Sequence, residues 1–198
     1  MTSHAKGFQL AELAVSLAVL TLLVLLGAPS LVQASGDLRL RLAAGELAGV
    51  LHLARASAVR LDANVAVKFR TEKDGTVTFT LYRDGDGDGV LNRDIDSGVD
   101  RPLGPPRRLG NLGRGVGFGF PPGPPPADPG SPGHPLSTSD PIRFNQSDLA
   151  SFSSLGTSTP GSLYLTDGVK RLLAVRVANR AGKVRILTWV PERRIWRD

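Results

Sequence analysis

The sequence contains no cysteine and one methionine, and only 6% of its 198 residues are aromatic. Without cysteine the chain has no disulfide, no thiolate metal site and no cysteine nucleophile. Its fold must therefore depend on packing and hydrogen bonds. At this length the chain has room for one globular domain with accessory segments, which excludes a large multidomain enzyme.

Candidate catalytic groups are also scarce. The three histidines, His4, His52 and His134, lie far apart, and no two have the spacing of a metal-ligand pair. Serines are frequent in residues 147–162, but no glycine-flanked nucleophile or partner histidine accompanies them. The sequence therefore predicts no catalytic residue and no enzymatic activity.

One long apolar run lies near the N-terminus. Residues 8–32 read FQLAELAVSLAVLTLLVLLGAPSLV, with Glu12 as the only charge. A helix of this length, at about 1.5 Å per residue, can cross the roughly 30 Å hydrocarbon core of a bilayer. A small domain offers little room to bury a helix that is apolar on every face. The run therefore predicts a transmembrane helix.

A cleaved secretory signal peptide, followed by an ordinary secreted β-domain, is the alternative for this segment. Ala28 and Ala34 lie at the end of the apolar run, where a signal peptidase would need small residues. Glu12 argues against this alternative. A carboxylate in a membrane segment costs about 3 kcal/mol or more unless it is paired, so it marks a functional site.

The residues before the apolar run resemble a known processing signal. The sequence KGFQLAEL at 6–13 is similar to the class III signal of type IV pilins and type II secretion pseudopilins, with Gln9 and Ala11 departing mildly from the commonest pattern. The resemblance implies that a prepilin peptidase cleaves between Gly7 and Phe8 and methylates the new amine of Phe8. It also implies that Glu12 neutralises the amine of an adjacent subunit during assembly.

The helix is expected to continue beyond the membrane. Gly27 and Pro29 predict a bend, because proline removes a backbone donor. Residues 33–62 then predict an amphipathic continuation that packs one face on a sheet. The residues expected on this face are Leu38, Leu42, Leu47, Val50, Leu51, Ala54 and Ala58.

The remaining residues, 63–198, predict an antiparallel β head domain. Alternating segments at 65–69 and 76–82 flank a Lys-Asp-Gly turn, which indicates a β-hairpin. Further strands are expected at 142–144, 161–165, 172–178 and 183–190, the last two as a second hairpin. The Pro- and Gly-rich residues 101–141 predict an exposed, partly disordered loop.

The C-terminal half also resembles the head domain of the GspH/FimT family of type IV pilin-like minor pseudopilins, which includes the type II secretion system protein H. The resemblance lies in residues 152–156, in PGSLYL at 160–165 and in a final hairpin with GKVR at 182–185. It implies an α+β, pilin-like fold, with a long N-terminal helix packed on an antiparallel sheet. The expected parts are a leader at 1–7, a transmembrane helix at 8–32, the amphipathic continuation at 33–62 and the head at 63–198.

Acidic residues concentrate between positions 84 and 100. The sequence DGDGDGVLN at 84–92 places oxygen ligands at alternate positions with glycine sixth, as in a calcium loop. This spacing predicts a calcium site at Asp84, Asp86, Asp88 and Asn92. Ile95 stands where a bidentate acid is expected, which argues against an EF-hand and leaves a solvated acidic turn as the alternative.

Basic residues concentrate near the C-terminus, beside Trp189 and Trp196. Such a surface can hold phosphates and stack bases. In the family, FimT-type members are associated with DNA uptake and a basic Gly-Arg-x-Arg turn, which residues 182–185 resemble with Lys in place of one Arg. A solvated strand face is the alternative. The candidate DNA-binding residues are Arg180, Lys183, Arg185, Arg193 and Arg194.

The resemblance implies two functions. The first is a structural pseudopilin in the bacterial inner membrane, with one span and a periplasmic head, that joins other subunits in the type II secretion pseudopilus and supports protein secretion across the outer membrane. The second is a FimT-like minor pilin of a type IV pilus that binds DNA. Calcium is the only cofactor that the sequence suggests.

Overall fold

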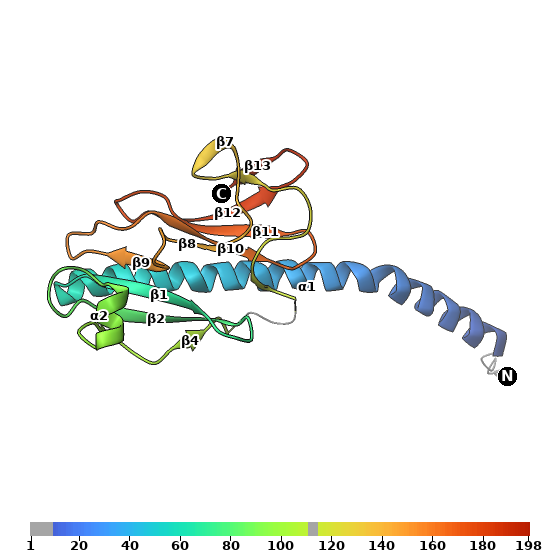
Figure 1. Cartoon of the computed structure of the whole chain (residues 1–198). Helices are drawn as coiled ribbons and strands as arrows, with labels where there is room; N and C mark the ends of the chain where they lie inside the picture. Colours follow the sequence, from blue (N-terminus) through green and yellow to red (C-terminus); the bar gives the residue numbers. More distant parts are fainter. Residues whose placement is uncertain (1–9, 111–114) are drawn as a thin grey trace.

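The structure is a computed structural model that describes residues 10–110 and 115–198, with only the backbone for residues 26–34 and 132. It contains one long helix, α1 (Leu10–Leu61), whose C-terminal half runs between two antiparallel sheets (Figure 1). The mixed α+β class expected from the sequence is confirmed. The arrangement is compatible with the pilin-like fold that the resemblance implies.

α1 is a single helix of 52 residues. Gly27 and Pro29 lie inside it, so the bend expected there does not end the helix. Figure 1 shows α1 curving in its N-terminal part and running straight where it meets the head. The segments predicted to cross the membrane and to pack on the head are therefore continuous.

The C-terminal half of α1 supplies one side of the main hydrophobic core. Leu40, Leu47 and Leu51 are fully buried there, at spacings of seven and four residues that align side chains on one helix face. The sequence placed Leu38 and Leu42 on this face, and that was wrong, because they are 58% and 48% exposed. Each lies two residues from Leu40. Two residues correspond to a rotation of about 200° around the helix axis, so Leu38 and Leu42 lie on the side opposite Leu40.

The first sheet forms around the hairpin predicted near residue 75. β1 (Val65–Thr71) pairs with β2 (Val77–Arg83) along its whole length, which confirms the prediction. Gly75 in the turn has a φ of 79°, a left-handed conformation that glycine adopts readily. The other strands of this sheet are β3 (Arg101–Pro102) and β4 (Arg107–Arg108), which pair with β2, and β9 (Leu149–Phe152), which pairs with β1.

The second sheet contains the four C-terminal strands that the sequence predicted. Its order is β13-β12-β11-β10-β5, with β8 beside β10. The predicted final hairpin is present, with Val177 opposite Val184 at its end. The strands are β5 (Gly117–Phe118), β8 (Ile142–Arg143), β10 (Gly161–Thr166), β11 (Leu172–Val177), β12 (Val184–Val190) and β13 (Ile195–Arg197).

Phe69 on β1 connects the two sheets. Its ring is stacked on Phe144 at a centroid distance of 6.3 Å and meets the edge of Phe118 at 6.5 Å. Phe79 on β2 lies 6.3 Å away on the same sheet as Phe69. Such aromatic pairs add to the free energy gained from burying apolar area.

The Pro- and Gly-rich residues 101–141 differ from the exposed, partly disordered loop expected from composition. The described part carries five short strands, including the two-stranded pair β6 (Ala127–Asp128) and β7 (Ser131–Pro135). Leu109 and Leu136 are buried, at 4% and 1% exposure. Leu136 packs with Tyr164, Leu172 and Leu187 in a second core on the face of the second sheet that α1 does not cover.

Shortening a core side chain of α1 tests this packing. Leu47→Ala should lower the free energy of unfolding by about 2–5 kcal/mol, because it leaves a cavity between α1 and the sheets. Leu42→Ala, on the exposed face of the same helix, should change it by less than about 0.5 kcal/mol. Urea unfolding of the detergent-solubilised protein, followed by tryptophan fluorescence, measures both. Equal effects would contradict the assignment of the buried face.

Candidate functional site

The N-terminal part of α1 is an exposed apolar rod. Leu10, Leu17 and Leu25 are 87%, 63% and 67% exposed, and the other large apolar side chains of Leu10–Leu25 are more than half exposed as well. α1 is long and apolar enough to span a membrane. Among the described residues, Ser35–Leu61 is a stretch of 27 residues that is apolar enough to cross a membrane, but 44% of its most apolar 18 residues is buried in the protein. The exposure of the side chains therefore marks Leu10–Leu25 as the apolar part of α1 that the rest of the described protein leaves uncovered.

Glu12 is the only charged residue of this exposed rod. It lies in the first turn of α1, where a carboxylate interacts favourably with the helix dipole. The Ser16 hydroxyl donates to the Glu12 main-chain oxygen at 2.7 Å, and Thr21 donates to Leu17 in the same way. The polar hydroxyls of the rod are thus satisfied within the helix. The predicted processing residues Gly7 and Phe8 lie outside the described residues.

A second candidate site is the acidic loop after β2, which is organised around Asp84. The Asp84 side chain accepts hydrogen bonds from Asn64 Nδ2 at 2.6 Å and from the backbone N–H groups of Gly87 at 2.7 Å and Gly89 at 2.9 Å. Partial burial acts to raise the pKa of Asp84, but these hydrogen bonds outweigh it and hold the pKa below its ordinary value. Asp84 therefore remains charged and fixes the start of the loop.

Asp100 closes the other end of the same loop. It is 1% exposed, and its carboxylate accepts hydrogen bonds from the backbone N–H groups of Gly85 at 3.0 Å and Leu91 at 2.9 Å. A side chain at Gly85 would meet the main-chain oxygen of Val99 at 2.1 Å, so only glycine fits there. The sequence reasoning did not single out Asp100, and nothing in the alternating motif points to it.

The structure brings three of the four predicted calcium ligands together. One carboxylate oxygen each from Asp84, Asp86 and Asp88 lies within 4.8 Å of the others. Loss of hydration raises the pKa of Asp88, and a hydrogen bond to Asp86 and the charge of Asp86 raise it further. A divalent cation would relieve this crowding of carboxylates. Asn92 begins the short helix α2 (Asn92–Ser97), which the sequence did not predict, and its amide donates to Ser147 O at 3.2 Å.

The five candidate DNA-binding residues are all exposed, but they lie at different places on the second sheet. Arg180 and Lys183 lie in the turn between β11 and β12, whereas Arg193 and Arg194 lie in the turn between β12 and β13. These two turns are separated by the length of β12, about 20 Å. Arg185, near the start of β12, is ion-paired with Asp198. The set therefore forms two basic ends and not one surface.

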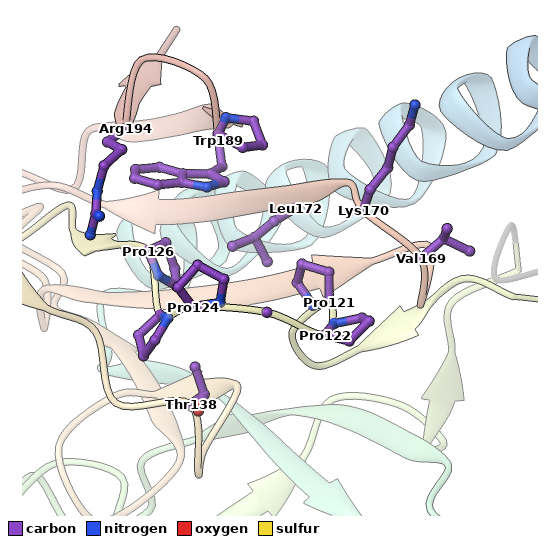
Figure 2. A pocket seen from close by; sticks show the side chains of 13 residues that line it. Pro121, Pro122, Pro124, Pro126, Thr138, Val169, Lys170, Leu172, Trp189 and Arg194 are labelled. Carbon is purple, nitrogen blue, oxygen red and sulfur yellow. The ribbon is translucent and has the colours of Figure 1, made fainter.

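A cavity of about 260 Å³ lies beside one of these basic ends. Figure 2 shows the prolines at 121–126 facing Trp189 and Leu172, with Arg194 and Lys170 at its sides. The prolines belong to the segment that the sequence predicted as a disordered loop. Trp189 packs on Trp196 at a centroid distance of 5.3 Å, and Trp196 Nε1 donates to Ala127 O at 2.7 Å. The tryptophans therefore hold this segment against the sheet.

Comparisons of the chain with protein-family models, with curated proteins and with solved structures find no match.

Calcium titration tests the acidic loop. If a calcium ion joins Asp84, Asp86 and Asp88, a concentration about 100 times the Kd should stabilise the protein by about 2.7 kcal/mol, a rise in Tm of about 5–10 °C. Asp88→Asn should remove the response, whereas Asp96→Asn, on the exposed part of α2, should retain it. A Tm that calcium leaves unchanged would favour the solvated acidic turn.

Proposed function

We propose that this protein is a minor pseudopilin, a structural subunit of a type II secretion pseudopilus. It is made with a leader that a prepilin peptidase removes between Gly7 and Phe8. The mature chain is held in the inner membrane by the N-terminal half of α1, with its head in the periplasm. It then joins a filament through contacts of this half with the helices of other subunits.

The division of α1 into two halves carries the proposal. Leu40–Ala58 is buried in the head on one face, whereas the large apolar side chains of Leu10–Leu25 are all more than half exposed and lie on all sides of the helix. An exposed apolar surface of this extent needs lipid or other protein to cover it. A helix fixed in its own head at one end and exposed at the other can move from lipid into a bundle of similar helices.

Glu12 supports assembly over simple anchoring. An anchor needs no charge, and a carboxylate in the membrane is costly without a partner of opposite sign. Phe8, whose amine cleavage would free, precedes Glu12 by four residues in the sequence. A neighbouring subunit displaced along the filament would bring its amine to the depth of Glu12. Pairing between Glu12 of one subunit and the amine of the next would set the register between their helices.

The separation of the basic residues favours this structural role over DNA capture by a FimT-like pilin. A groove that follows a nucleic-acid backbone places its cations along one surface. Here Arg180 and Lys183 are separated from Arg193 and Arg194 by the length of β12, and Arg185 is paired within the chain. The DNA-binding alternative therefore has less support from the geometry than assembly has.

Processing tests the proposal most directly. In a bacterium with a prepilin peptidase, the membrane-extracted protein should begin at methylated Phe8, as measured by N-terminal sequencing and intact mass. Gly7→Ala should leave the leader attached, because it changes the residue after which the proposed signal is cleaved. Gly45→Ala, which adds a methyl group in open space on α1, should be processed normally. A mature chain that begins near Gln33 or Ser35 would instead identify a signal peptidase substrate and overturn the proposal.

Neutralising Glu12 should separate anchoring from assembly. Glu12→Gln should remain in the membrane fraction but be lost from sheared pseudopili, because removing one partner of a buried ion pair costs about 3–5 kcal/mol. Ser16→Ala, one turn further along the same helix, should still be incorporated. Quantitative immunoblotting of both fractions measures the outcome. Equal incorporation of the two variants would show that Glu12 does not set the register.

A further inference from the structure

A polar pocket lies on the face of the second sheet that α1 does not cover. Its volume is about 300 Å³. The sheet supplies its floor through Ser162 and Tyr164, which are 3% and 1% exposed. The β6–β7 hairpin supplies one wall, through Asp128 and Gly130. The pocket is distinct from the acidic loop, from the exposed half of α1 and from the proline-lined cavity of Figure 2.

The register of three strands places two arginines at this pocket. Arg143 on β8 and Arg176 on β11 both lie directly opposite Ser162 on β10, one on each side. Residues directly opposite one another project from the same face of a sheet. Arg143, Ser162 and Arg176 therefore form a row across the sheet, with one guanidinium group on each side of the buried Ser162 hydroxyl. The three residues are far apart in the sequence, so no local motif predicts that they lie together.

Arg176 has no acidic partner among the described residues. Its one hydrogen bond there runs from Nη1 to Ser162 Oγ at 3.1 Å, although a guanidinium has several N–H donors. It is also directly opposite Arg185, and cross-strand pairs of like charge are destabilising. The arrangement therefore leaves donors of Arg176 available to a ligand.

The other groups of the pocket also have hydrogen-bond donors available to a ligand. Arg143 Nη1 lies 3.8 Å from Asp128 Oδ2, a long contact that leaves most of its donors available. Burial raises the pKa of Tyr164, so its hydroxyl stays protonated and can donate. The Ser162 hydroxyl and the charges of Asp128, Arg143 and Arg176 also act on that pKa, which places the Tyr164 oxygen among these side chains.

The charge of the pocket selects the ligand. Two guanidinium groups and the carboxylate of Asp128 leave a single positive charge, which one negative charge would neutralise. Guanidinium groups match the planar, two-oxygen geometry of a carboxylate. We propose that this pocket is a carboxylate-binding site, with Arg176 as the main anchor, Arg143 as the second and the Tyr164 hydroxyl as an additional donor. The carboxylate comes either from a free organic acid or from an Asp or Glu side chain of another protein chain.

Gly130 provides a way to perturb the anchor without removing it. A Cβ atom at this position would lie 2.9 Å from both terminal nitrogens of Arg176. Gly130→Ala should therefore displace the guanidinium while its charge is kept. A loss of binding in this variant would come from position and not from net charge.

The experiment uses the full-length protein in nonionic detergent and saturation-transfer NMR, which detects weak binding. The probes are acetate, its neutral counterpart acetamide, and the capped peptides Gly-Asp-Gly and Gly-Asn-Gly. The Asp peptide and acetate should bind, and their neutral counterparts should not. Arg176→Gln should weaken binding by about tenfold or more, as expected for loss of a charge-assisted hydrogen bond. Arg101→Gln, on the exposed strand β3, should leave it unchanged.

The outcomes separate the sources of the carboxylate. Acetate that binds as tightly as the peptide indicates a free acid, whereas a peptide that binds about tenfold tighter indicates a side chain of another chain. If Arg176→Gln does not fold, as judged by its Tm, Gly130→Ala gives the same test. Equal binding of acetate and acetamide, or full binding by both variants, would overturn the proposal.

Discussion

The burial of one face of α1 between two sheets is the interaction on which the rest of the structure depends. Leu40, Leu47 and Leu51 fill the space between the sheets, and Phe69 joins the sheets beside them. Because the helix uses only one face in this way, its other face stays exposed along the head. Because the same helix continues to Leu10 without interruption, the orientation of the head also fixes the orientation of the exposed apolar half.

Features that depend on local periodicity could be predicted from the sequence. The apolar N-terminal run, the hairpin around Gly75 and the final hairpin each follow from neighbouring residues. The buried face of α1 was only partly predicted, because apolar residues occur on both faces and periodicity cannot tell Leu40 from Leu42. The strand β9 was missed because its four residues form a strand only where the free edge of β1 offers them partners.

In the candidate sites, too, only the features set by neighbouring residues could be predicted from the sequence. The alternating aspartates predicted which carboxylates come together, since the chain brings them together within one loop. The closure of that loop by Asp100 and the row of Arg143, Ser162 and Arg176 depend on contacts between distant segments. The disordered loop predicted from the composition of residues 101–141 was also wrong, because Leu136 and the tryptophans of the second sheet hold the prolines in place. A few apolar anchors are sufficient to order a segment that is otherwise poor in them.

The continuity of α1 also has a mechanical consequence. At about 1.5 Å per residue its 52 residues form a rod of about 78 Å. In the head this rod runs roughly along the strands of both sheets (Figure 1). A force that pulls the N-terminal end of α1 along the axis therefore loads the contacts between helix and sheets in shear, all at once. It does not separate them one by one, so the contacts between helix and sheets resist an axial pull together.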